Sequence, residues 1–454
     1  MAESISSNGY VPPKTIPYFT SNGIPFGYSP LGFYLLAIGV DVSGLSYRYA
    51  SFALRLLWFT LSPLAIYLFV RQLSTRRAAA LASVLVTISL PVFRWHLGHG
   101  GVIRGLAFCL SFVTLALALK SFQTESAKLQ IGAGVAFGLT VLTHPVYAVF
   151  AGFGTVGLWV GSDRSIDGFR CGGNIATIGF LISAPWILWV TFTHGVDIFL
   201  YASGTHGGLF EVHHHLYAVI SLPTHGLIEK LLWYLGILCL GILFYEYRFH
   251  VVALFVATAV FLGGTIRFTF SLLLISIAIV VIDFLPNWVS QIDIDQLSLR
   301  RRSAAIVSVG LVFAAAFAGV GAAQSLPHDS FSDADRDAAK WAKTETASDA
   351  TFIVQGAEEE FPFFAKRTSL VVPWGAEWDG PGAYQHHLEM LESVYSCSNT
   401  TCFSKLTAEN DLDPDYLYLQ RHLVTESSFS ESEKYTAEYQ NEQILIVSVK
   451  SRES

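Results

Sequence analysis

Long apolar stretches separated by short basic turns dominate the first 325 residues. A helix needs roughly twenty consecutive apolar residues to cross a bilayer, and stretches of this kind recur often enough to predict about ten crossings. Residues 30–40 are apolar but too short to cross, which predicts a helix at the membrane interface. The predicted spans are 52–70, 78–93, 102–119, the two arms of 129–160, 174–193, 231–245, 251–263, 268–284 and 304–321.

The apolar run 129–160 is interrupted by one histidine and one proline. It is too long for one span and suits two. Pro145 has no N–H to donate and disfavours helical geometry at His144, so we expect a helical hairpin that breaks at 143–145. The tip would put the His144 imidazole at a membrane surface, where it can meet an anionic headgroup or phosphate. The alternative is a turn residue with a solvated side chain.

The pattern changes after residue 324, where polar residues become frequent and short apolar runs alternate with amphipathic ones. Helices are predicted at 333–344 and 384–395, and strands at 351–355, 369–374, 416–419 and 443–449. We therefore expect an outer loop with an interfacial helix at 1–48, a transmembrane bundle at 49–324, and a soluble α/β domain at 325–454.

Composition supports the same division. The chain is 52% hydrophobic and only 14% charged, with a mean hydropathy of +0.47, which is typical of a polytopic membrane protein. Residues 1–324 hold 18 Lys+Arg and 12 Asp+Glu, a net charge of +6, whereas residues 325–454 hold 10 and 23, a net charge of −13. Membrane lipids are therefore the expected surroundings of the first part. Neither part shows a nucleic-acid signature.

Basic residues in the short loops predict the orientation, because they accumulate on the cytoplasmic side. Eleven fall on one side of the predicted topology and seven on the other. The first side is therefore expected to be cytoplasmic, with the α/β domain exterior and the protein multi-pass in the plasma membrane. The eleven are Arg71, Arg76, Arg77, Lys120, Lys128, Arg164, Arg170, Arg248, Arg300, Arg301 and Arg302.

Several of the seven basic residues on the opposite side lie inside apolar segments near their outer ends. The seven are Lys14, Arg48, Arg55, Arg94, Arg104, Lys230 and Arg267. An arginine in a membrane is costly and needs an anionic partner. The alternative is snorkelling of each side chain to the lipid headgroups.

Histidines also gather on the outer side, most densely in the loop 194–230, which carries the acids Asp197, Glu211 and Glu229. The consecutive residues His213, His214 and His215 cannot all ligate one ion from a helix, since neighbours diverge by about 100°. A metal site stays open here, with a hydrated loop and partial helix as the alternative.

Cys397 and Cys402 are the only cysteines after residue 324. In an oxidising space they can close a small disulfide loop. The sequon Asn399-Thr400-Thr401 also fits an exterior location.

Four segments, in order, resemble the GT-C superfamily of membrane glycosyltransferases, especially the polyprenyl-phosphate-dependent aminoarabinose and mannosyl transferases. The segment 27–40, GYSPLGFYLLAIGV, resembles the family's interfacial helix. The segment 49–89 is similar to its second and third spans, and 134–152, GVAFGLTVLTHPVYAVFAG, to the hairpin whose tip lies near the lipid phosphate. A last span followed by an outer α/β domain completes the resemblance, which covers most of residues 24–325.

The resemblance implies transfer of a sugar from a lipid-linked phosphate donor to an acceptor on the outer face. A carboxylate would deprotonate the acceptor, and cations would offset the charge on the departing phosphate. By placement, Arg104, Arg267, His144 and Arg94 are the phosphate-side candidates, and Glu211 and Asp197 the candidates for the acid. No cofactor is indicated with certainty, and a divalent cation is left open.

The chain departs from the family in one respect. The family begins with a first span and an outer loop bearing a catalytic acid, whereas here Glu3 is the only acid before Asp41, so we expect a chain that lacks the first span. Two other interpretations stay open. A transporter would also be lined by Arg and His, although it would usually show an internal repeat. A non-catalytic scaffold would explain the missing acid.

Overall fold

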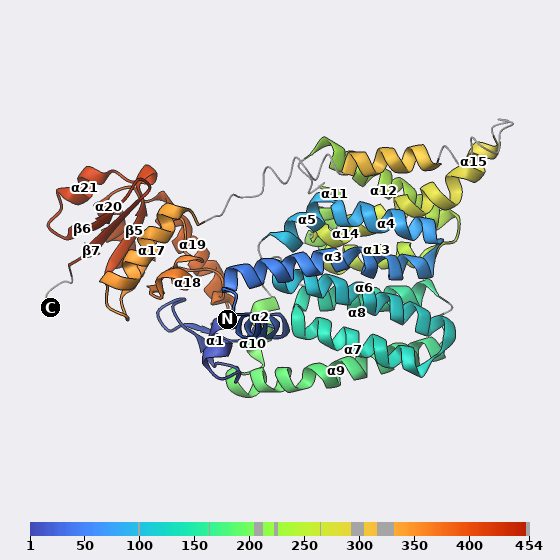
Figure 1. Ribbon diagram of the computed structural model, residues 1–454, viewed down its shortest axis with the longest axis horizontal. Helices are drawn as coiled ribbons and strands as arrows, with labels where there is room; N and C mark the ends of the chain where they lie inside the picture. Colours follow the sequence, from blue (N-terminus) through green and yellow to red (C-terminus); the bar gives the residue numbers. More distant parts are fainter. Residues whose placement is uncertain are drawn as a thin grey trace.

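A helical bundle and a smaller α/β domain lie end to end in the computed structural model (Figure 1). The structure describes residues 1–98, 100–162, 164–203, 212–221, 226–263, 265–291, 304–315 and 331–450. This arrangement confirms the fold class expected from the sequence, a polytopic helical protein with a sheet-containing C-terminal region.

Within the described residues, five helices are long and apolar enough to cross a membrane. They are α3 (Tyr47–Leu73), α6 (Gly101–Thr124), α9 (Ile166–His194), α12 (Leu227–Tyr245) and the continuous helix Ile266–Trp288, which comprises α14 (Ile266–Ile279), a π-helical turn (Val280–Phe284) and the start of α15 (Leu285–Gln291). Shorter apolar helices are α2 (Leu31–Ser43), α7 (Ala127–Thr143), α8 (Pro145–Gly161), α13 (Phe249–Leu262) and Ala304–Ala315. The count of about ten crossings stays a prediction.

The hairpin break lies where the sequence predicts it. Helix α7 ends at Thr143, His144 has an extended backbone, and Pro145 opens α8. Proline is well suited to this first helical position, where its missing N–H costs no hydrogen bond.

The predicted span 78–93 is a pair of helices with a sharp bend, and whether the pair crosses the membrane stays a prediction. It divides into α4 (Arg76–Ile88) and α5 (Leu90–Leu97), which are bent by 60° relative to each other. Pro91 lies in the first turn of α5 and lacks the N–H that a continuous helix would need there. The bend turns the residues of α5 toward the α/β domain.

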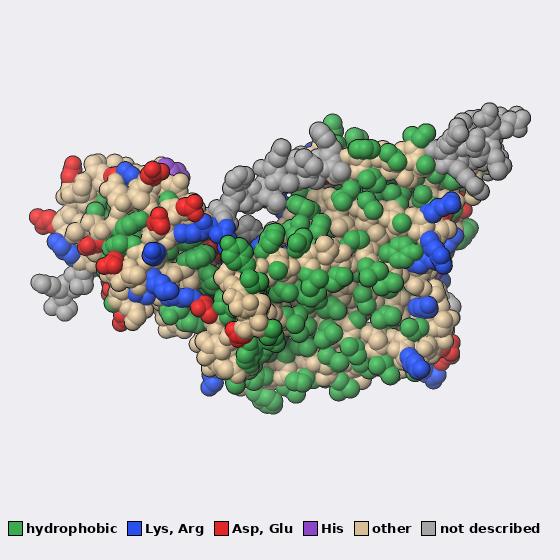
Figure 2. Space-filling model, in the orientation of Figure 1, with side chains coloured by type: hydrophobic (Ala, Val, Ile, Leu, Met, Phe, Trp, Pro, Cys, Tyr) green, Lys and Arg blue, Asp and Glu red, His purple; other side chains and the backbone are tan. Residues whose placement is uncertain are grey.

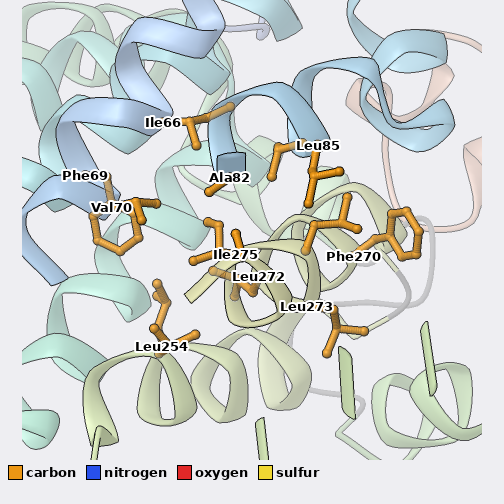
Figure 3. Packing of buried hydrophobic residues seen from close by; sticks show 14 of the residues in the cluster. Ile66, Phe69, Val70, Ala82, Leu85, Leu254, Phe270, Leu272, Leu273 and Ile275 are labelled. Atoms are coloured by element: carbon orange, nitrogen blue, oxygen red, sulfur yellow. The ribbon is translucent and has the colours of Figure 1, made fainter. Parts of the chain in front are cut away.

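Helix α14 is the centre of the bundle. Its residues from Arg267 to Ile279 are all buried, as expected for a helix that is apolar on every side. Figure 3 shows Phe270, Leu272, Leu273 and Ile275 of α14 among side chains of three other helices. These neighbours include Ile66, Phe69 and Val70 of α3, Ala82 and Leu85 of α4, and Leu254 of α13.

The α/β domain is a five-stranded mixed sheet with helices on both faces. The strand order is β4-β3-β5-β7-β6, with β3 parallel to β4 and β5, and β7 antiparallel to β5 and β6. Alternate strand residues face two separate cores, one under α17 and α18 and the other under α19 and α20. The strands are β3 (Thr351–Val354), β4 (Thr368–Ser369), β5 (Tyr416–Gln420), β6 (Tyr435–Gln440) and β7 (Ile444–Val449), and the helices are α17 (Asp333–Glu345), α18 (Phe361–Ala365), α19 (Ala383–Ser396), α20 (Thr400–Glu409) and α21 (Glu426–Ser430).

Most of the predicted elements of this domain are confirmed, with one strand shortened and one missed. The predicted strand 369–374 is reduced to Thr368–Ser369, and the buried residues after it run without strand pairing to Pro373. Strand β6 lacks an apolar signal, because most of its residues are exposed at the sheet edge. A disulfide joins Cys397 and Cys402, whose Cα atoms are 5.4 Å apart.

The N-terminal segment links the bundle to this domain. It contains α1 (Ala2–Ser7) and a hairpin of β1 (Thr15–Ile16) and β2 (Ile24–Pro25). Phe19 then pairs in parallel with Ser369 at the edge of the main sheet. Glu3 forms an ion pair with Lys366. The segment therefore holds the α/β domain against the bundle.

The two ends of the bundle differ in charge. On the face seen in Figure 2, hydrophobic side chains cover most of the bundle, and Lys and Arg side chains gather at the end farthest from the α/β domain. We call this end the basic end and the opposite one the domain end. A pocket of about 540 Å³ at the basic end is lined by Thr75, Arg76, Arg77, Arg248, Ile282 and Asp283.

Candidate functional site

A cavity of about 960 Å³ lies at the domain end, where the bundle, the N-terminal segment and the α/β domain meet. Its lining comes from all three parts, which are far apart in the sequence. The bundle contributes Ser51, Arg55, Leu90, Pro91, Arg94, Trp95, Gly100, Gly101, Val102, Ile103, Arg104, Glu229 and Ile266; the segment 28–36 contributes Tyr28, Phe33 and Leu36; the α/β domain contributes Glu359, Pro373, Trp374, Glu377 and Tyr384.

Two arginines share one aromatic ring beside this cavity. The guanidinium carbon of Arg104 lies 4.6 Å from the centre of the Trp95 ring, and that of Arg267 lies 5.1 Å from it. Arg267 also lies 5.0 Å from the Tyr147 ring. The electron-rich ring faces attract both cations, which brings two positive charges to the same place.

Arg267 is only 7% exposed, and within the described part of the chain no carboxylate forms an ion pair with it. Its Nε has no hydrogen-bond partner. A buried charge without a counter-charge is strongly unfavourable. The arrangement is therefore suited to receive an anion.

The backbone before α6 places Arg104. Gly100 has a left-handed conformation with φ of 68°, which glycine adopts without strain. A Cβ at this position would lie 3.2 Å from the guanidinium carbon of Arg104. The glycine thus leaves room for the side chain that lines the cavity.

The other arginines near the cavity have different surroundings. Arg55 donates to the carbonyl oxygens of Leu97 and Gly98, at 3.0 and 3.3 Å, and so caps the end of α5. Arg94 lines the cavity and is exposed. We regard Arg55 as holding α5 in place and Arg94 as a charge at the rim.

His144 is buried and not a solvated turn residue. It is 5% exposed, and its Nδ1 accepts a hydrogen bond from the backbone N–H of Val146. Its Nε2 is buried and has no partner. The ring packs edge-on against Tyr28, which lines the cavity, with the ring centres 5.7 Å apart. His144 thus lies directly behind the cavity wall.

A second histidine, His96, completes this layer. Its Nε2 lies 2.8 Å from the hydroxyl oxygen of Tyr147, whose ring also faces Arg267. The hydrogen bond ties the α5 segment to the hairpin. Trp95, whose ring both arginines contact, directly precedes His96, so this hydrogen bond also helps to hold Trp95 in place.

The α/β domain supplies carboxylates to the opposite wall. Burial, with the negative charges of Glu360, Glu358 and Glu377, raises the pKa of Glu359 to about 7, and the positive charge of Arg104 lowers it by a smaller amount. The pKa of Glu377 is also raised, mainly by burial. Its carboxylate accepts a hydrogen bond from the backbone N–H of Gly375 at 2.7 Å. The cavity therefore has a cationic wall and an acidic wall.

Of the two acids expected from the sequence, Glu211 and Asp197, the structure describes only Asp197. Asp197 opens α10 (Asp197–Ser203), where it is exposed, and it is not in the cavity lining. Glu211 lies outside the described residues. In the described part of the chain, no three His, Cys, Asp or Glu side chains converge on a point that could hold a metal ion. The acid assignments thus stay predictions from placement.

Sequence reasoning missed the acidic wall. Glu358 to Glu360 lie in the turn that begins four residues after the end of β3, and the carboxyl ends of parallel strands are common ligand-binding positions. The sequence contains this strand and the glutamates after it, but it does not predict that this edge of the sheet lies against the membrane bundle. Trp95 and Tyr28 gave no signal, because isolated aromatic residues are frequent throughout the chain.

No protein-family model matches the chain, and no curated protein matches it in sequence. Solved structures do match it. ArnT from Cupriavidus metallidurans, solved with undecaprenyl phosphate, superposes with a TM-score of 0.57 at 15% identity, over 98% of this chain and 91% of ArnT.

The oligosaccharyltransferase AglB from Archaeoglobus fulgidus, solved with an inhibitory peptide and a dolichol-phosphate, matches with a TM-score of 0.61 at 15% identity, over 92% of this chain. The chain spans 64% of the length of AglB. The mycobacterial arabinofuranosyltransferase AftD matches over 99% of this chain and 39% of its own length, with a TM-score of 0.55 and 14% identity. All three are GT-C glycosyltransferases, so the chain has the GT-C fold that the resemblance implied.

Proposed function

We propose that this protein is a membrane glycosyltransferase that takes a sugar from a polyprenyl-phosphate donor in the cavity at the domain end. The observation that carries the proposal is the pair of arginines on Trp95: Arg267 is buried with no ion-pair partner in the described part of the chain, and Arg104 lines the cavity. Arg104 lines the cavity together with Glu359 and Glu377 of the α/β domain, and Arg267 lies beside it on the Trp95 ring.

The donor's chemistry fits this distribution of charge. When the bond between the sugar and the phosphate breaks, the electron pair leaves with the phosphate oxygen, and the phosphate gains one negative charge. Arg104 and Arg267 would stabilise that charge best in the transition state and in the product. Arg94 would attract the headgroup at the rim, and His144 would reach it from behind Tyr28.

The similar structures support the lipid-linked donor. ArnT was solved with undecaprenyl phosphate and AglB with a dolichol-phosphate, both of which carry a phosphate on a polyprenyl chain. A shared fold alone does not transfer a substrate. In this chain, half-buried Arg104 in the cavity lining and buried Arg267 beside it are the independent reason to expect the same class of ligand.

The proposed site faces the exterior. The basic end carries the arginines of the 71–77 loop and Arg248, and such residues favour the cytoplasmic side. The α/β domain, at the other end, would then be outside, from about residue 325 onward. The Cys397–Cys402 disulfide is consistent with an oxidising compartment.

Binding of undecaprenyl phosphate tests the proposal directly. The purified full-length chain in lipid nanodiscs should bind it, and Arg104→Ala and Arg267→Ala should each weaken binding roughly ten- to a hundredfold, since a charge-assisted hydrogen bond contributes about 1.5 to 3 kcal/mol. Arg76→Ala, at the basic end, is the matched control and should leave the affinity unchanged.

Equal losses from Arg76→Ala and Arg267→Ala would remove the site assignment. A wild-type chain that binds no undecaprenyl phosphate would contradict the proposed function and favour a scaffold. Circular dichroism and thermal unfolding of each variant check that the bundle is intact, which matters most for the buried Arg267.

A further inference from the structure

Two of the three glutamates that line the cavity, Glu359 and Glu377, come from the α/β domain, which the sequence did not connect with the chemistry; the third is Glu229 of the bundle. Three consecutive glutamates, Glu358 to Glu360, lie between β3 and α18, and of these only Glu359 lines the cavity. Resting on the proposed function, we propose that Glu359 is the general base that takes the proton from the acceptor. The soluble domain would then supply a catalytic group to a site otherwise built by the membrane bundle.

Geometry distinguishes Glu359 from its neighbours. The Glu358 carboxylate accepts a hydrogen bond from the Tyr395 hydroxyl at 3.1 Å. Glu360 immediately precedes α18 and lies outside the cavity lining. Glu377 lines the cavity, but the backbone N–H of Gly375 occupies its carboxylate. Among the described residues, no hydrogen bond or ion pair occupies the Glu359 carboxylate, which leaves it available to a substrate.

The surroundings of Glu359 give it the properties of a base. Glu359 is an exposed residue that lines the cavity, so a substrate can reach its carboxylate. With a pKa of about 7, it is half ionised at neutral pH and holds a proton more strongly than an ordinary glutamate. A base works best when its pKa lies near the operating pH. The other charged or titratable groups that line the cavity are Tyr28, Arg55, Arg94, Arg104, Glu229, Glu377 and Tyr384.

In the proposed step, one proton moves to Glu359 and the sugar moves from the phosphate to the acceptor oxygen. A Glu359 oxygen takes the proton from an acceptor hydroxyl, and the acceptor oxygen forms a bond to the anomeric carbon of the sugar. The bond from that carbon to the phosphate oxygen breaks, and its electron pair stays on the phosphate beside Arg104. The proton leaves Glu359 for water after the product departs. No oxidant, reductant or further reactant is needed.

Two measurements on the full-length chain in nanodiscs test this role. Consumption of an undecaprenyl-phosphate-linked hexose, by transfer to an added sugar alcohol or to water, should fall at least about a hundredfold in Glu359→Gln, because a general base contributes about 10² to 10⁴ in rate. Undecaprenyl phosphate should still bind within about twofold of the wild type. Glu359→Asp should recover part of the rate.

The pH profile separates a base from a structural residue. The wild-type rate should fall as the pH drops through about 7, because protonated Glu359 cannot accept a proton. Glu360→Gln is the matched control and should keep the rate at high pH. Removing that negative charge takes away one cause that raises the pKa of Glu359, so the fall should move to lower pH.

The outcomes separate this inference from the proposed function. Wild-type consumption in Glu359→Gln, or an unchanged pH profile in Glu360→Gln, would overturn the base assignment and leave the donor site intact. Loss of undecaprenyl phosphate binding in Glu359→Gln would also overturn it, since the residue would then act in binding. A wild-type chain that neither binds undecaprenyl phosphate nor consumes the donor would overturn both.

Discussion

The two ends of the bundle both carry arginines, yet only one of them resembles a binding site. At the basic end, Arg76, Arg77 and Arg248 are exposed around a pocket that also contains Asp283. At the domain end, Arg267 is buried and stacked on Trp95 with no ion-pair partner among the described residues. The number of positive charges is therefore less informative than their hydration and their partners.

Hydrogen bonding shows the same contrast. Asp283 accepts a hydrogen bond from the Thr75 hydroxyl at 3.0 Å, so polar groups at the basic end satisfy one another. His250, near that end, lies 3.2 Å from the Ser162 hydroxyl through its Nε2. At the domain end the Nε2 of His144 is buried and has no partner. Buried polar groups are rarely left in this state, which marks the domain end as prepared for a ligand.

The largest expected contrast is in accessibility. Single cysteines introduced at Glu409, in the α/β domain, and at Arg76, in the basic loop, should react differently with a membrane-impermeant thiol reagent on intact cells. Glu409→Cys should label fully, and Arg76→Cys only after permeabilisation. The free native cysteines of the described chain, Cys109, Cys171 and Cys239, are buried and should give little background. Labelling of Arg76→Cys in intact cells would reverse the orientation.

A histidine pair gives the next contrast. His144→Phe keeps an aromatic ring against Tyr28 but removes the unpartnered Nε2. Affinity for undecaprenyl phosphate should fall about fivefold, since a hydrogen bond contributes about 1 kcal/mol. His250→Phe is the control near the basic end and should change the affinity less than twofold. Titration by microscale thermophoresis measures both, and identical affinities for the two variants would show that His144 only packs.

The smallest expected effect concerns the rim. Arg94 is exposed, and an exposed ion pair contributes about 0.2 to 1 kcal/mol, so Arg94→Ala should weaken binding about two- to fivefold at low salt. At about 0.5 M salt the difference should disappear, because screening acts strongly on exposed charges. The Arg267→Ala deficit should persist under the same conditions. A deficit in Arg94→Ala that does not respond to salt would place this arginine inside the site.

Local features of the sequence were sufficient to predict much of the fold. Apolar length predicted the membrane helices, Pro145 predicted the hairpin break, and alternating short patterns predicted the α/β domain. Pro91 carried an equally local signal, yet the bend that it makes was missed, because the surrounding run is continuously apolar. The GT-C resemblance rested on the order of these local elements, and the structural comparison confirms it at the level of the fold.

The candidate site depended on tertiary structure to a greater extent. The sequence by itself determined that Arg104 and Arg267 lie within apolar segments, where a charge needs an anion. It could not determine that both arginines contact the Trp95 ring, because that contact depends on the bend between α4 and α5. It gave no indication that Glu359 reaches the cavity, which Glu229 of the 194–230 loop also lines. The physical reason is that periodicity and proline act over a few residues, while a site joins residues 28, 104, 267 and 359 through packing between distant segments.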